Sequence, residues 1–300
     1  MKISKFFVEE IDFSTRLVNL RAHVQQIENL LDAMERVQNI DVCALYAPSS
    51  EDFYSLNTTE GALADSLFSA DIAQEYRDLL LRLQIVISRA QPFPSGHAGT
   101  SIGLACLQAE GIGALVAVSK PDECTWWSDD NMHLVSKDGD VETAIRKHFL
   151  AAKIEEKHFS NFCPFMFGNI YFHTQPEKIK DMGLSYEDNI EKIISHLSYL
   201  NDFAISDFSD GETDHIIKGR AGSHGVEISG ESVKTRHNVG AMKERNITLN
   251  GEELCCEWHT KLAETKGRIH FYAYGNRADR IKAVVGDKLI IGVFADHLTT

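Results

Sequence analysis

The chain has 300 residues, of which 43% are hydrophobic and 25% charged, so it can bury the core of one large domain or two ordinary ones. Its formal net charge of -14 argues against tight, non-specific binding to nucleic acid. No apolar run approaches the ~20 residues of a membrane-spanning helix, and the charged first residues lack the apolar stretch of a signal peptide. We therefore expect a cytoplasmic protein without membrane contact, whose cysteines are reduced.

The predicted elements of the first two thirds alternate between helices and strands. Helical periodicity covers residues 14–37, 62–89, 140–157 and 185–200, and Pro92 and Pro94 end the second of these helices. Short buried strands are predicted at 42–46, 113–119 and 169–173. Gly103, Gly111 and Gly113 do not form a nucleotide-binding fingerprint. This pattern predicts an acidic mixed α/β domain over residues 1–205.

The last third has a different character. Residues 206–230 are rich in Gly, Ser, Asp and Glu, which predicts a linker or mobile loop, and residues 231–245 are helical. Asn250-Gly251 predicts a hairpin between 246–249 and 252–262, and Gly286-Asp287 predicts another between 281–285 and 288–294. A turn at 263–267 leads into a strand at 268–274. Residues 231–300 are thus predicted to form a five-strand antiparallel meander packed on a helix, which makes the whole chain α+β.

Charge and histidines also separate this last third. From His215 to Thr300 there are 13 basic and 10 acidic residues, a balance of +3, which leaves 17 basic and 34 acidic residues in the remainder, a balance of -17. Six of the 13 histidines lie in the same segment. Local phosphate binding and acid–base chemistry are therefore expected here.

Two neighbouring strands group polar side chains on one face. If Leu262 pairs with Gly267, Lys261 lies opposite Arg268, His259 opposite His270, and Glu257 opposite Tyr272. The facing cations repel each other unless an anion, or a carboxylate such as Glu257, lies between them. The register therefore predicts a receptor for an anion or a working acid–base site.

Metal-independent RNA cleavage is the chemistry that suits this set best. His259 and His270 are the predicted base and acid, Lys261 and Arg268 stabilise the charged phosphorane, and Tyr272 orients the substrate or stacks on a base. This interpretation needs no metal or cofactor, and RNA or the ribosome is the expected partner. The basic residues of the preceding helix are predicted to steer phosphate toward the face: Lys234, Arg236, Lys243 and Arg245.

Three alternatives stay open. The polar face is a plain solvated sheet surface, or His259, His270 and His297 bind a metal together with Glu257, which would make the protein a metal-dependent hydrolase. In the third, the chain is a non-catalytic subunit of a bacterial defence complex that binds a partner protein or a nucleotide signal.

The C-terminal signature resembles that of a group of uncharacterised bacterial proteins associated with anti-phage defence loci. The residues that carry it are 256–262 (CEWHTKL), 268–271 (RIHF), 290–292 (IIG) and His297-Leu298. The order of a helix followed by an antiparallel sheet is also similar to toxins of the RelE/ParE superfamily. This resemblance implies an mRNA-interferase-like fold and ribonuclease activity in antiviral defence, with Lys261, Arg268 and Tyr272 as counterparts by residue type. RelE-type toxins are small and strongly basic, whereas this chain is long and acidic, and this departure suggests that the acidic first section restrains or directs the C-terminal unit.

Overall fold

The computed structural model describes residues 3–59, 61–93, 101–208, 212–275 and 277–300, and the chain divides into two compact units, 1–153 and 154–300. The division therefore differs from the predicted domains 1–205 and 231–300. The segment 206–230, expected to be a linker, carries α12 (Asp214–Ser223) and β9 (Ile228–Ser229), while residues 209–211 lie outside the described residues. Three of its apolar residues, Ile217, Val226 and Ile228, are buried within the second unit, whereas Ile216 is exposed.

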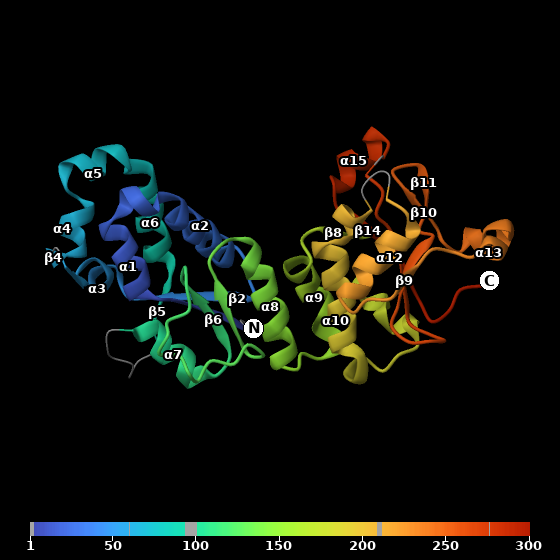
Figure 1. Cartoon of the computed structure of the whole chain (residues 1–300), viewed down its shortest axis with the longest axis horizontal. Coiled ribbons are helices and arrows are strands. Elements are labelled where there is room, and N and C mark those ends of the chain that lie inside the picture. Colours follow the sequence, from blue (N-terminus) through green and yellow to red (C-terminus); the bar gives the residue numbers. More distant parts are fainter. Residues whose placement is uncertain (1–2, 60, 94–100, 209–211, 276) are drawn as a thin grey trace. The chain divides into compact units, whose positions relative to one another are not determined.

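The first unit is built on a parallel sheet in the order β5-β2-β1-β6-β7. Figure 1 labels β2, β5 and β6 of this sheet. Its strands are β1 (Ser4–Val8), β2 (Cys43–Ala47), β5 (Gln91–Pro92), β6 (Gly113–Val116) and β7 (Met132–Val135). The strands predicted at 42–46 and 113–119 are confirmed as β2 and β6, so the mixed α/β character of this section is confirmed. Parallel pairing explains the apolar runs Phe6–Val8 of β1 and Gly113–Val116 of β6, because both faces of such a sheet are covered.

The helices of this unit are shorter than the periodicity predicts. The predicted helix 14–37 is two helices, α1 (Glu10–Val18) and α2 (Leu20–Gln38), joined at Asn19. The predicted helix 62–89 follows the short hairpin of β3 (Asn57–Thr58) and β4 (Gly61–Ala62), and is divided into α4 (Leu63–Leu67), α5 (Ala70–Glu75) and α6 (Arg77–Arg89). No proline or glycine lies at these breaks, so the sequence lacks the usual signals by which a helix end is predicted. The remaining helices are α3 (Ser50–Tyr54), α7 (Ile102–Glu110) and α8 (Gly139–Ala151).

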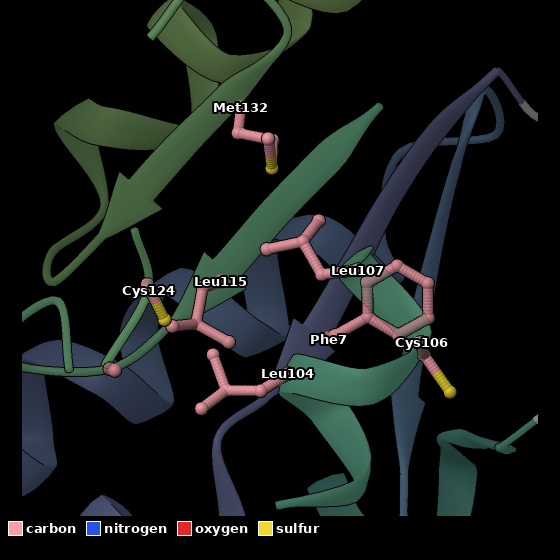
Figure 2. Packing of buried hydrophobic residues seen from close by; sticks show 8 residues of the cluster. Phe7, Leu104, Cys106, Leu107, Leu115, Cys124 and Met132 are labelled. Carbon is pink, nitrogen blue, oxygen red and sulfur yellow. The ribbon is translucent and has the colours of Figure 1, made fainter. Parts of the chain in front are cut away.

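Helix α7 packs closely on β1. Figure 2 shows Leu104 and Leu107 of α7 beside Phe7 of β1 and Leu115 of β6. A Cβ added at Gly103 would lie 2.3 Å from the carbonyl oxygen of Val8, so only glycine allows this approach.

The strand order also places a topological switch point between β1 and β6, where α/β proteins commonly bind phosphates at a helix N-terminus. Here the carboxylate of Glu10 accepts hydrogen bonds from the backbone N–H groups of Ile102 and Gly103. The side-chain carboxyl group of Glu10 therefore occupies the N-terminus of α7.

The second unit contains a mixed sheet in the order β8-β14-β13-β12-β9. Its strands are β8 (Ile170–Phe172), β12 (Trp258–Lys261), β13 (Arg268–Tyr272), β14 (Leu289–Ala295) and β9. All neighbours are antiparallel except β8, which is parallel to β14. The helices are α9 (Glu156–Met166), α10 (Tyr186–Asp202), α11 (Ala204–Asp207), α12, α13 (Val233–His237), α14 (Val239–Lys243) and α15 (Asp279–Val285), with a 3-10 helix at Pro176–Met182.

The predicted meander is therefore wrong in its topology, although α+β is the correct class. The Asn250-Gly251 hairpin is confirmed: it joins β10 (Asn246–Leu249) to β11 (Glu252–Cys255), and both turn residues have positive φ, 48° and 77°. However, this pair forms a separate ribbon, and the predicted strand 252–262 is broken between β11 and β12. The predicted strand 281–285 is helix α15, which ends at Gly286.

Candidate functional site

The predicted register of the two polar strands is confirmed over Trp258–Lys261, whereas Glu257, predicted opposite Tyr272, precedes β12. The backbone N–H of Leu262 donates to the carbonyl of Gly267 at 2.9 Å, His259 pairs with His270, and Lys261 pairs with Arg268. The two imidazole rings lie 4.8 Å apart between centroids. The turn at 263–267 sets this register, because it closes the hairpin of β12 and β13.

Lys261 and Arg268, the two cations of this register, both have partners within the protein. Lys261 Nζ lies 2.7 Å from Glu227 Oε1. The guanidinium of Arg268 donates to the carbonyl oxygens of Ala263 and Glu264 at 2.6 and 2.7 Å, and burial lowers its pKa. Arg268 therefore closes the turn, and Lys261 is the one of the two that lies beside an exposed carboxylate.

Glu257 and Tyr272 also have local partners. Glu257 accepts a hydrogen bond from Arg236 Nε at 3.0 Å, and the carboxylate that pairs with Lys261 is that of Glu227. Tyr272 pairs with Ile290 of β14, burial raises the pKa of its phenol, and the Arg277 guanidinium lies 5.7 Å from its ring centroid. Tyr272 also packs against the apolar cluster that contains Ile247 and Ile290.

The histidines themselves are withdrawn from water. His270 is 1% exposed, and burial is the main cause that lowers the pKa of both His259 and His270 to about 3. Both rings are therefore neutral at pH 7. An imidazolium with such a pKa is scarce near neutral pH, which leaves the predicted acid–base pair without its acid.

Glu231 completes a cluster that the sequence did not reveal. Its Oε1 lies 3.6 Å from His259 Nδ1, and one potential ligand atom each of Glu231, His259 and His270 lie within 4.8 Å of one another. Glu231 precedes α13 and reaches the strands only through the return of β9 to the edge of β12. No spacing in the sequence connects it to the histidines.

A hydrogen bond fixes the proton of His270, and one tautomer of His259 presents a lone pair toward the same point. His270 Nδ1 lies 3.2 Å from the carbonyl oxygen of Cys256, which can only accept, so this nitrogen carries the proton and Nε2 carries the lone pair. His259 Nε2 lies 3.1 Å from Ser229 Oγ. With Nε2–H donating to Ser229, the lone pair of His259 lies on Nδ1, which is buried and has no hydrogen-bond partner among the described residues. Such outer partners fix the ring orientation of metal-binding histidines.

Two imidazoles and one carboxylate form a common ligand set for divalent transition metals. The metal alternative predicted from the sequence contained His297 and Glu257, but His297 is exposed, and the cluster found among the described residues contains Glu231 in place of both.

The predicted phosphate-steering residues do not share one face. Arg245 is buried and its Nε lies 2.6 Å from Glu231 Oε1, while Arg236 pairs with Glu257. Lys234 and Lys243 are exposed on α13 and α14. The predicted single helix is broken at Asn238, whose side chain accepts a hydrogen bond from the backbone N–H of Ala241. Arg245 instead neutralises the buried carboxylate of the cluster.

No described helix combines the length and the apolar character that crossing a bilayer demands. Comparison of the chain with protein-family models, with curated proteins and with solved structures finds no match in any of the three.

Proposed function

We propose that the second unit is a metal-dependent hydrolase in which Glu231, His259 and His270 hold a divalent transition metal such as zinc. The observation that carries this proposal is the convergence of the three ligand atoms within 4.8 Å of one another. Both imidazoles are neutral at pH 7, which is the form that binds metals.

Three protein ligands leave a coordination position for water, as in catalytic zinc sites. A metal at this position would lower the pKa of bound water and supply hydroxide near neutral pH. Arg245 hydrogen-bonds the Glu231 carboxylate and balances its charge inside the protein. This chemistry does not require an acidic histidine, which the low pKa of His259 and His270 disfavours.

Ribonuclease activity and a role in anti-phage defence stay predictions from the sequence. RNA remains a substrate to test, with one change in the expected mechanism: cleavage by this centre would depend on the metal. A metal-independent mechanism would leave cleavage intact in a chelator.

The test is hydrolysis by the purified full chain with and without EDTA, followed by addition of Zn²⁺ or Mn²⁺. The substrates are p-nitrophenyl phosphate, bis(p-nitrophenyl) phosphate, p-nitrophenyl acetate and an RNA oligonucleotide. We expect activity on at least one substrate that EDTA abolishes, that metal restores, and that His259→Ala and Glu231→Gln lose. His297→Ala and Glu257→Gln are the matched controls and should retain it. Activity that survives EDTA, or that survives His259→Ala, would contradict the proposal.

A further inference from the structure

The candidate metal centre has little negative charge to offer a metal ion. Glu231 is the one acidic member of the cluster, and Arg245 Nε lies 2.6 Å from its Oε1. The side chains of Glu231 and Arg245 are 5% and 2% exposed, so the guanidinium balances the carboxylate where water screens little. Both imidazoles bind metal in their neutral form. The ligands and Arg245 together therefore bring no net charge to a divalent ion.

Further positive charge lies beside the two histidines. Lys261 and Arg268 are the next pair on the same face of β12 and β13, because each is two positions from the histidine of its strand. Lys261 is paired with Glu227, whose side chain is 68% exposed. Arg268 donates to backbone carbonyl oxygens, and no carboxylate among the described residues lies within 4.0 Å of its guanidinium. The charge of Arg268 is therefore not paired.

The acidic residues at the edge of the cluster do not offset these cations. Glu244 lies 3.9 Å from Arg245 Nη1, but its side chain is 38% exposed and also accepts hydrogen bonds from the backbone N–H and the hydroxyl of Thr299. Water and salt screen such exposed charges. A divalent ion bound to the cluster would thus leave a net positive charge in a buried place, which is costly unless an anion accompanies it.

We propose that the centre binds its metal together with an anion, which takes the open coordination position and makes the substrates and inhibitors of the centre anionic. This inference rests on the proposed function. The anion donates a lone pair to the metal, and none of its own bonds breaks when it binds. Hydroxide from bound water satisfies the same charge balance, so an added anion competes with hydroxide. A phosphate ester and a carboxylate share the required chemistry, which is an oxygen atom that carries negative charge.

The first test measures the zinc affinity of the full chain while sodium perchlorate is replaced stepwise by sodium azide. Constant ionic strength separates coordination of the anion from screening. Azide should tighten zinc binding at least about fivefold, which is the lower end of the usual coupling between two ligands. Cobalt in place of zinc should report the anion directly, because azide on the metal changes its visible absorption. Equal zinc affinity in azide and in perchlorate would overturn the inference.

The second test removes the cation that balances Glu231. In Arg245→Met the carboxylate is left to balance the metal, so zinc should bind at least about tenfold more tightly than to the parent protein, and azide should change that affinity by less than about twofold. Arg280→Met is the matched control, because Arg280 is 54% exposed, pairs with Glu252 outside the cluster and carries the same charge. It should keep the zinc affinity and the azide effect of the parent protein. Weaker zinc binding in Arg245→Met would contradict the charge argument.

A milder variant keeps the charge argument testable if Arg245→Met does not fold. The Lys261 side chain is 28% exposed and its Nζ contacts the exposed Glu227, so Lys261→Gln disturbs no buried ion pair. It should lower the azide effect about twofold, the size of one partly exposed charge contact. An azide effect that is larger in Lys261→Gln than in the parent protein would count against the inference.

Two oxygen anions then identify the class of substrate. Methylphosphonate stands for a phosphate ester and acetate for a carboxylate, while acetamide is a neutral control with the shape of acetate. The anion that tightens zinc binding more gives the class. An equal effect of acetamide and acetate would overturn the role of charge.

The outcomes separate this inference from the proposed function. Zinc that binds through Glu231, His259 and His270 without any effect of anions overturns the inference and leaves the metal centre standing. A chain that binds no zinc in either salt overturns both. Zinc binding that azide tightens, in a chain that hydrolyses none of the test substrates, supports the coupled binding of metal and anion and overturns the hydrolase.

Discussion

Replacing Arg245 by methionine separates the charge of the cluster from its packing. The side chains of Arg245 and Glu231 are 2% and 5% exposed, so the variant leaves a carboxylate in the interior without its guanidinium. Removing one partner of a buried pair typically costs about 3–5 kcal/mol. The same arginine donates to the carbonyl of Ala241 at 2.7 Å, so the loss should lie within that range. Urea unfolding at pH 7 in EDTA measures it.

The double variant Glu231→Gln/Arg245→Met tests whether charge causes the loss. With both charges removed, the cost of an unpaired buried carboxylate disappears, and the double variant should be more stable than Arg245→Met alone by about 2 kcal/mol or more. An additive double variant would show that the two side chains act independently.

Zinc should rescue Arg245→Met more than it stabilises the parent protein. A metal ion at the cluster supplies the positive charge that the variant lacks, and a ligand at about 100 times its Kd adds about 2.7 kcal/mol to the free energy of unfolding. His259→Ala/Arg245→Met is the control without a complete ligand set and should show no rescue. The reasoning is refuted if Arg245→Met costs less than about 1 kcal/mol in EDTA, or if zinc stabilises both proteins equally.

Three further predictions concern parts of the fold away from the cluster. Burial lowers the pKa of His148 to about 4, so the folded state binds fewer protons than the unfolded state below about pH 6.5. The contribution of His148 to the free energy of unfolding is therefore complete above that pH and is smaller by about 2 kcal/mol at pH 5. His148→Leu should flatten the fall in the urea midpoint between pH 7 and pH 5. Gly103→Ala places a Cβ 2.3 Å from the Val8 carbonyl oxygen and should cost about 1–3 kcal/mol or more in thermal melts, while Gly139→Ala, whose Cβ meets no atom within 4 Å, should not destabilise. Tyr199→Phe removes a 3.0 Å hydrogen bond from the tyrosine hydroxyl to Asp207 and should lower the free energy of unfolding, measured in urea, by about 1.5–3 kcal/mol. A loss below about 0.5 kcal/mol would contradict a strong buried hydrogen bond to the carboxylate.

Local signals in the sequence were sufficient where one residue type dictates the backbone. Asn250 and Gly251 tolerate positive φ, so their hairpin is predictable, and the alternation of β12 and β13 determined the pairing of His259 with His270. The signal at Gly286 was ambiguous, since a glycine of positive φ ends helix α15 as readily as it forms a hairpin.

The candidate site was only half predictable, for a different reason. The two histidines lie on adjacent strands, but Glu231 reaches them because β9 returns to the edge of β12 after α12. That return depends on a few buried apolar side chains in an otherwise polar segment, which composition alone classified as a linker. The burial of Arg245 results from the same packing and could not be predicted from the distribution of charged residues in the sequence.

Metal content of the purified chain tests the central claim most directly. Plasma mass spectrometry after zinc loading and gel filtration should find one metal ion per chain, and Glu231→Gln, His259→Ala and His270→Ala should each lower zinc affinity by about 10- to 100-fold or more. Glu257→Gln and His297→Ala, the ligands that the sequence suggested, should keep the parent stoichiometry. A chain that binds no zinc, or that binds it equally well without His259, would contradict the metal centre.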